Sequence, residues 1–250
     1  MGRKAAVLRI AVAAILCVFF AVLAFRATAA QTVSHGRLEV LNGYTVVSLE
    51  GTPEDMGTAY GQLLGRTIQR VVSDVITDDF GRDPEYYSRI RAASKVMERY
   101  QPKEYLAELH ALAKAAKVSY DDLLLLQYFG DVPRGISGVR MEAQCTSFAI
   151  LPPNTRDKVC LVGRNFDFFD HGVGEYASVL IYYRPAGKIP FVTVTWAGII
   201  NGWTLLNANG VLVSNNTSHE GRNSLEGMST SFLLRHPPAG GRRASMKESI

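Results

Sequence analysis

The chain has 250 residues, of which 47% are hydrophobic and 20% are charged, and its formal net charge is +4. This length and composition fit one sizeable globular domain or two small ones, and they exclude a chain that is mostly disordered or of low complexity. Without the four basic residues of 1–29, the chain has 23 basic and 23 acidic residues. The remainder therefore lacks the positive excess of a nucleic-acid-binding protein.

Residues 1–29 show the pattern of a secretory signal peptide. Arg3, Lys4 and Arg9 give a basic start, residues 10–25 form an uninterrupted apolar run, and Ala-Thr-Ala at 27–29 matches a signal-peptidase site. A membrane-spanning helix needs about 20 apolar residues, so this run is short for a permanent anchor. We therefore expect a secreted or periplasmic protein. The alternative is an uncleaved N-terminal anchor, and no other contact with a membrane is expected.

The segment after the signal begins with strands and continues with helices. Residues 37–41 and 44–49 alternate as two strands around a turn at Asn42 and Gly43. Thr52, followed by Pro53 and by Asp55 at the third position, marks the start of a helix that continues to about residue 75. Further helices are expected at about 84–100, 102–117 and 123–129, the last of them capped by Ser119 and Asp122.

The pattern changes from helical to alternating near Gln144. Glycine and proline residues make 130–142 loop-like. Helices followed by a meander of strands indicate an α+β fold with a boundary at this point. The expected strands are 145–151, 159–166, 176–184, 191–196, 203–207 and 211–215, followed by a short helix at 229–236.

Cys145 is the strongest candidate for chemistry. A thiol at the first position of a strand, directly after a loop, can attack the carbonyl carbon of Gln144 and release Cys145 as a new N-terminus. The α-amine formed in this way has an ordinary pKa of about 7.7–8.0, which suits a general base for the neighbouring thiol. A nearby base and thiolate character are what make a cysteine nucleophilic.

Arg164 and Asp167 are the expected partners of Cys145. If 145–151 and 159–166 form a hairpin turning near residues 154–155, paired residue numbers add up to 309 and Arg164 lies opposite Cys145. A cation there would stabilise the thiolate, and a carboxylate would hold the α-amine. Arg164 and Asp167 have opposite parity on a strand, so both face one site only where the strand ends or bulges near Phe166.

The second cysteine after the signal, Cys160, raises the alternative of a disulfide. In the same register Cys160 pairs with Ala149, about 13 Å along the strand from Cys145. A disulfide needs Cα atoms within about 7 Å, so this register disfavours the bond. A disulfide between Cys145 and Cys160 remains the alternative for an exported domain.

Three motifs carry a resemblance to a known family. They are Cys-Thr-Ser-Phe-Ala at 145–149, Gly-Arg-Asn-Phe-Asp at 163–167 and Asn-Ala-Asn-Gly-Val-Leu-Val-Ser-Asn-Asn at 207–216. Together they resemble the N-terminal nucleophile hydrolases of the isopenicillin N acyltransferase-like (acyl-coenzyme A:6-aminopenicillanate acyltransferase) group. Choloylglycine hydrolases and acid ceramidase are more distant relatives of that group. Gly-Thr-Pro-Glu-Asp-Met-Gly at 51–57, followed by Tyr60 and Gly61, resembles the group's propeptide.

The resemblance implies an αββα sandwich, self-cleavage between Gln144 and Cys145, and an acyl-enzyme formed from a linear amide. By position, Cys145 is the nucleophile and Arg164 and Asp167 support it. The backbone N–H of Asn216 matches an oxyanion-hole donor, with Asn215 as the alternative one residue away.

The resemblance also divides the chain. Residues 30–144 correspond to a mainly helical propeptide or α-subunit, and 145–250 correspond to the start of the catalytic domain, the two forming a subunit pair after cleavage. From Cys145 to the end there are 106 residues. The family's second sheet and side-chain oxyanion Asn come later in the chain, so the resemblance implies a catalytic domain that is incomplete at its C-terminus.

The remaining candidates are weaker. Trp196 and Trp203 flank Gly198 and Gly202 and are interpreted as lining an apolar substrate pocket, with core packing as the alternative. The five histidines show no metal-ligand spacing, so neither a metal nor another cofactor is expected.

The sequence therefore predicts an exported, autoproteolytic cysteine amide hydrolase or acyltransferase with a small acyl-amide substrate and no nucleic-acid partner. The alternative is a truncated, catalytically inactive homologue, or a disulfide-containing exported module that binds a partner or has a structural role.

Overall fold

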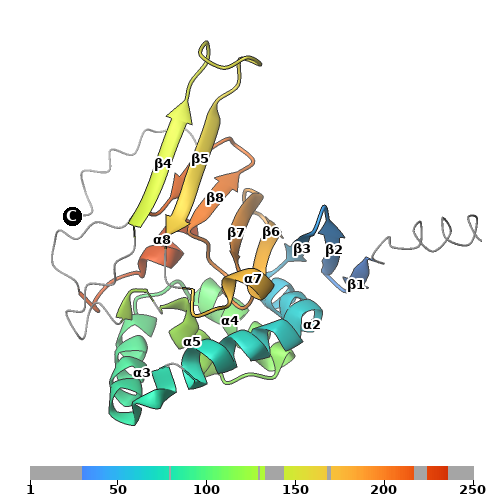
Figure 1. Cartoon of the computed structure of the whole chain (residues 1–250). Coiled ribbons are helices and arrows are strands. Elements are labelled where there is room, and N and C mark those ends of the chain that lie inside the picture. The colour runs from blue at the N-terminus through green and yellow to red at the C-terminus, as the bar shows by residue number, and fades with distance from the viewer. Residues whose placement is uncertain are drawn as a thin grey trace, which may run out of the picture.

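A computed structural model describes residues 30–78, 80–128, 130–132, 144–167, 170–216 and 224–235 (Figure 1). The predicted signal peptide and most of the predicted loop before Gln144 lie outside these residues. In chain order, the described elements are β1 (Gln31–Val33), β2 (Gly36–Leu41), β3 (Tyr44–Gly51), α2 (Pro53–Val72), the π-helical turn η1 (Ser73–Thr77), the 3-10 turn η2 (Phe80–Arg82), α3 (Pro84–Glu98), α4 (Lys103–Ala116), α5 (Tyr120–Gln127), β4 (Gln144–Ile150), β5 (Leu161–Asp167), α7 (Gly174–Ala177), β6 (Ser178–Pro185), β7 (Phe191–Trp196), β8 (Thr204–Asn207), β9 (Leu212–Ser214) and α8 (Thr230–Arg235).

Local sequence signals placed most of these elements correctly. Asn42 and Gly43 have φ angles of 51° and 86° in the β2–β3 turn, as the Asn-Gly pair predicts. Thr52 caps α2: its side chain accepts from the backbone N–H of Asp55, whose carboxylate accepts from the Thr52 N–H. This is the capping box that the sequence predicted. The expected strand at 176–184 was wrong at its start, because residues 174–177 form the short helix α7.

Helices α2 and α4 approach each other closely because two glycines of α2 face α4. A Cβ atom at Gly57 would lie 2.2 Å from the carbonyl oxygen of Glu108, and one at Gly61 would lie 2.7 Å from the Cβ of Ala115. Larger residues at these positions would therefore force the helices apart. The sequence provides the close contact through glycine, at the cost of lower intrinsic helix propensity.

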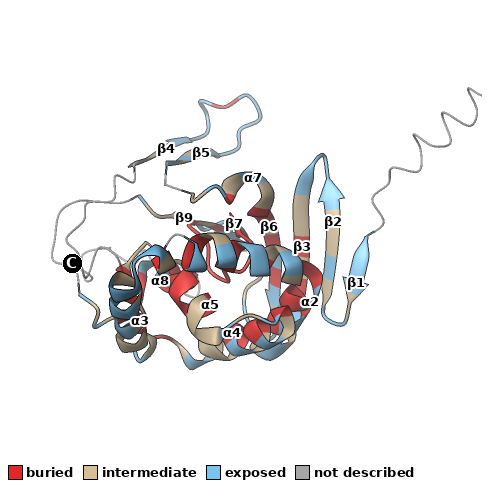
Figure 2. Cartoon of the chain, turned by 60° about the horizontal axis from the view of Figure 1, so that its bottom comes forward, coloured by how far each residue is buried: buried red, intermediate tan, exposed pale blue. Residues whose placement is uncertain are grey.

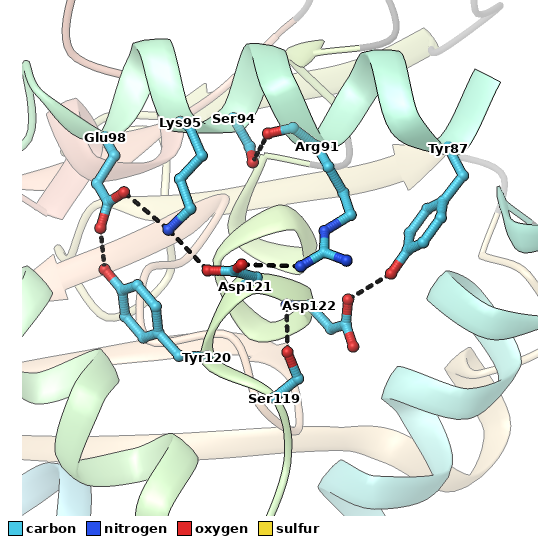
Figure 3. A network of polar contacts seen from close by, with 9 residues as sticks. All are labelled: Tyr87, Arg91, Ser94, Lys95, Glu98, Ser119, Tyr120, Asp121 and Asp122. Atoms are coloured by element: carbon cyan, nitrogen blue, oxygen red, sulfur yellow. Dashed lines mark hydrogen bonds and ion pairs between the residues drawn. The ribbon is translucent and has the colours of Figure 1, made fainter. Parts of the chain in front are cut away.

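Helices α3 and α5 are joined by a network of polar contacts (Figure 3). Asp121 at the start of α5 binds two cations of α3, with Arg91 Nη2 at 2.8 Å and Lys95 Nζ at 2.7 Å from its carboxylate oxygens. The network continues through Tyr87, which donates to Asp122 at 2.6 Å, and Tyr120, which donates to Glu98 at 2.5 Å. These contacts fix the orientation of the two helices relative to each other.

The main sheet combines strands from both sides of residue 144. Its seven strands have the order β1-β2-β3-β6-β7-β8-β9. The strands β3 and β6 are parallel and pair from Thr45–Val179 to Gly51–Pro185, whereas the other neighbours in this sheet are antiparallel. Figure 1 shows α2 to α5 grouped on one side of the molecule. The segments 30–144 and 145–250 therefore share one sheet, and helical and strand residues share one hydrophobic core.

Two buried polar side chains tie the helices to the loop after β7. The hydroxyl of Tyr60 in α2 accepts from Gly198 N–H at 3.0 Å. Gln127 at the end of α5 donates to the carbonyl oxygen of Gly198 at 2.9 Å and accepts from Ile200 N–H at 3.0 Å. Buried backbone groups need such partners, so these side chains fix the path of the loop between β7 and β8.

The hairpin β4–β5 forms a second, two-stranded sheet that projects from the rest of the molecule (Figures 1 and 2). Its paired residue numbers add up to 311 rather than the predicted 309, so Ser147, and not Cys145, lies opposite Arg164. The connection, residues 151–160, contains two successive turns, in which Asn154 N–H donates to Leu151 and Lys158 N–H donates to Thr155. Because β5 begins only at Leu161, the centre of the connection lies one residue later than expected. A shift of two in the pairing leaves every side chain on its predicted face.

The fold is α+β, as the sequence predicted. The face of the main sheet away from the helices carries large apolar side chains that remain exposed, among them Tyr182, Val194 and Leu206. Among the described residues, no helix is long and apolar enough to span a membrane.

Candidate functional site

Cys145 occupies the second position of β4, directly opposite Phe166 of β5. Its side chain is half-buried, and both Cys145 and Cys160 are free thiols. Cys160 is exposed and precedes β5, and the predicted pairing of Cys160 with Ala149 was wrong, because Ala149 pairs with Val162. Cys145 and Cys160 both lie in the described part of the chain and form no disulfide with each other there.

Arg164 contacts the thiol directly. Its Nη2 atom lies 3.5 Å from Cys145 Sγ and also donates to the carbonyl oxygen of Asn215 at 2.7 Å. The guanidinium is half-buried, and its central carbon lies 4.6 Å from the centre of the Phe166 ring. Burial lowers the pKa of Arg164, and Cys145 and Asp167 oppose that shift. The arrangement puts a positive charge next to a potential thiolate.

The end of β9 meets the β4–β5 hairpin at this point. Asn215 N–H donates to the carbonyl oxygen of Trp203 at 3.0 Å, which fixes the backbone that Arg164 binds. The next residue, Asn216, accepts a hydrogen bond through Oδ1 from Ser147 Oγ at 3.0 Å. These contacts bring together residues of three segments: Cys145 and Ser147 of β4, Arg164 of β5, and Asn215 and Asn216 after β9.

Asp167 is placed differently from the other predicted residues. It is the last residue of β5, is exposed and pairs with Gln144 rather than with Cys145. Directly opposite residues share a face and successive residues alternate, so Asp167 faces away from Arg164 and Cys145. Within the described chain it makes no hydrogen bond to either. Its influence on Arg164 is electrostatic.

Gln144 is the first residue of β4, which places the predicted scissile bond at the very start of the strand. The residues immediately before it, 133–143, are outside the described part of the chain, so the predicted loop character of that segment stays a prediction.

An aromatic cluster lies next to the thiol. Phe166 stacks on Trp203 with ring centres 4.6 Å apart, and its ring centre lies 6.2 Å from that of Trp196 in an edge-on contact. The two tryptophans are 6% and 9% exposed and belong to the main core. Their burial favours the core-packing alternative, while Phe166 is the aromatic residue that reaches the side of the hairpin carrying Cys145.

Two residues of the site were not predicted from the sequence. Ser147 and Phe166 share the face of Cys145, since they are two residues along β4 and directly opposite on β5, respectively. The alternation of the strands would have indicated both, because residues i and i+2 of a strand line one face. Among the described residues, no group of three or more metal-ligating side chains is present.

Two curated proteins resemble the chain, and no family model matches it. An uncharacterized protein of Archaeoglobus fulgidus is 26% identical over 194 residues, which are 69% of this chain and 32% of that protein. Protein dcd1A of Dictyostelium discoideum is 24% identical over 225 residues, which are 78% of this chain and 49% of that protein. The chain therefore spans about a third and about half of the length of these relatives.

Proposed function

We propose that the chain is part of an exported cysteine amide hydrolase or acyltransferase of the N-terminal nucleophile type. The observation that carries the proposal is the double contact of Arg164, which lies 3.5 Å from the Cys145 sulfur and binds the Asn215 carbonyl at 2.7 Å. One side chain thus joins the candidate nucleophile to the segment with the candidate oxyanion donor, Asn216. The motifs at 145–149, 163–167 and 207–216 support the same reading.

The first reaction is self-cleavage at Gln144. The Cys145 sulfur attacks the Gln144 carbonyl carbon, the C–N bond breaks, and the nitrogen takes up the thiol proton to become the α-amine of Cys145. Water then hydrolyses the thioester, which gives a carboxylate on Gln144 and regenerates the thiol. Arg164 supports the attack by stabilising the thiolate.

The second reaction uses the same sulfur on an external amide. The α-amine of Cys145 takes the thiol proton, the sulfur adds to the substrate carbonyl, and the Asn216 N–H donates to the oxygen that becomes negative. The leaving amine takes the proton as the C–N bond breaks, and a thioester remains. Water resolves this thioester in a hydrolase, and a second amine or another acceptor nucleophile resolves it in an acyltransferase.

The proposal includes the sandwich fold and export. The apolar side chains exposed on the outer face of the main sheet support the αββα arrangement, because a second sheet packed there would bury them. The pattern of residues 1–29 supports secretion or a periplasmic location.

Mass spectrometry of the purified protein tests the proposal. We expect a fragment that begins at Cys145, and we expect Cys145→Ala to abolish it. Cys160→Ala is the matched control, since Cys160 is exposed and lies outside the contact with Arg164. Processed protein should then release the amine from a chromogenic acyl amide.

An intact chain from about residue 30, together with no hydrolysis of the acyl amide, would contradict the enzymatic reading and favour an inactive homologue. A lack of titratable thiols after denaturation would instead favour the disulfide-containing module.

A further inference from the structure

A cavity of about 740 Å³ lies at the end of the main sheet remote from Cys145. Its walls come from the first turn of α2, from α4, from the β6–β7 and β8–β9 connections and from the end of α8. Phe191 at the start of β7 lines it, whereas Trp196 at the end of β7 belongs to the aromatic cluster near Cys145. Five residues of strand separate the two, or about 17 Å at 3.3 Å per residue.

A buried ion pair lines this cavity. Arg235 of α8 donates through Nη2 to Glu108 Oε2 of α4 at 2.6 Å, and the two side chains are 3% and 1% exposed. Arg235 also donates through Nη1 to the carbonyl oxygen of Ile200 at 2.7 Å, and it lies against the rings of Tyr105 and Phe191. The guanidinium is therefore held firmly on several sides.

One of the two carboxylate oxygens of Glu108 takes no part in the ion pair with Arg235. Its Oε1 atom has no hydrogen-bond donor among the described residues. Burial raises the pKa of Glu108, and the charge of Arg235 opposes that rise. A buried acceptor without a donor destabilises the fold because it loses its hydrogen bonds to water, and the cost is larger when the acceptor is charged. A donor supplied from outside the described chain would remove this cost.

We propose that the cavity is a second ligand site, which binds a small apolar molecule through an uncharged N–H or O–H group, an amide or an alcohol, that donates to Glu108. Met56, Ile189 and Phe191 provide an apolar wall, and the volume falls within the range of small-molecule sites. The charges are already balanced, because Glu108 pairs with Arg235 and Glu104 pairs with Lys188. A cationic ligand would bury an uncompensated charge, which disfavours an ammonium group.

The test uses Cys145→Ala protein, so that no amide is consumed and the result does not depend on the proposed reaction. The probe is N-benzylacetamide, and its binding is measured by ligand-observed NMR titration. N-benzyl-N-methylacetamide has the same apolar body without the N–H donor. We expect it to bind at least tenfold more weakly, because Glu108 then gains no hydrogen bond.

A pair of variants locates the probe. Ala208 is exposed and lines the cavity, so Ala208→Trp should fill its mouth and weaken binding of the probe at least tenfold. Ala149→Trp makes the same change on the β4–β5 hairpin, away from the cavity, and should leave binding unchanged. Equal binding of the two amides, binding that survives Ala208→Trp, or no binding of the probe at millimolar concentration would overturn the proposal.

Discussion

At the scale of single residues, Arg164 determines the character of the candidate site. Its guanidinium loses solvent by burial, which lowers the pKa of Arg164, and the nearby Cys145 and Asp167 oppose this effect. A charge that has lost part of its hydration interacts more strongly with a neighbouring ion than an exposed charge does. Arg164 is therefore well placed to favour the ionised form of the thiol 3.5 Å away.

Replacement of Arg164 by Met should slow the alkylation of Cys145 by iodoacetamide at pH 7 about tenfold, because the stabilising cation is lost. The rate is followed by mass spectrometry of the peptides that contain each cysteine. Cys160 serves as the internal control, since its exposed thiol should react at the same rate in both proteins. An unchanged rate at Cys145 would show that Arg164 does not activate the sulfur.

The sequence identified Cys145 and Arg164 as neighbours through the expected hairpin pairing, and because the pairing is shifted by two residues, both side chains still share one face. It missed the partner that Arg164 faces, Ser147, because the register of a hairpin depends on the shape of its connection. The connection extends to residue 160, so β5 begins two residues later than expected and the pairing moves by two residues. No pattern within the strands themselves encodes that shift.

At the scale of elements, the network between α3 and α5 contributes electrostatically to the stability of the fold. The hydrogen bond from Lys95, followed by that from Arg91, lowers the pKa of Asp121. A carboxylate whose pKa is lower in the folded state stabilises the fold above its unfolded pKa of about 3.9. This stabilisation is lost as the pH falls through the lower folded value.

Asp121→Asn should therefore reduce the free energy of unfolding by about 0.5–1 kcal/mol at pH 7, a modest value because the side chains are over a third exposed. The difference from the unmodified protein should shrink as the pH falls below 4. Urea unfolding followed by circular dichroism at both pH values measures it. Asp157→Asn on the exposed β4–β5 connection is the control and should have no effect. A difference that stays constant with pH would mean that the loss is not electrostatic.

At the scale of the whole molecule, the segments before and after Gln144 form one structure. Seven residue pairs join β3 to β6, and the core contains side chains of both segments. Tyr60 and Gln127, which precede Gln144, hold the loop that contains Gly198 and Ile200. The boundary that the sequence suggested near Gln144 is therefore a change of secondary structure and does not divide the sheet or the core.

If the chain is cleaved before Cys145, the two fragments should stay together under native conditions, because separation would expose the shared core. We expect them to elute as one species of about the uncleaved size in gel filtration, and to separate in 6 M guanidinium chloride, a denaturing concentration. Cys145→Ala protein, which should remain uncleaved, gives the reference elution volume. Elution of the fragments at two separate volumes without denaturant would contradict the shared core.

The sequence by itself determined the local elements, since the signals for a capped helix at Thr52, a turn at Asn42 and Gly43, and alternating strands operate within a few residues. Only the tertiary structure decided that β3 pairs with β6, that Asp167 faces away from Arg164, and that Ser147 meets Asn216. These arrangements join residues far apart in the chain, and burial and loop geometry select among pairings that look equivalent within each strand.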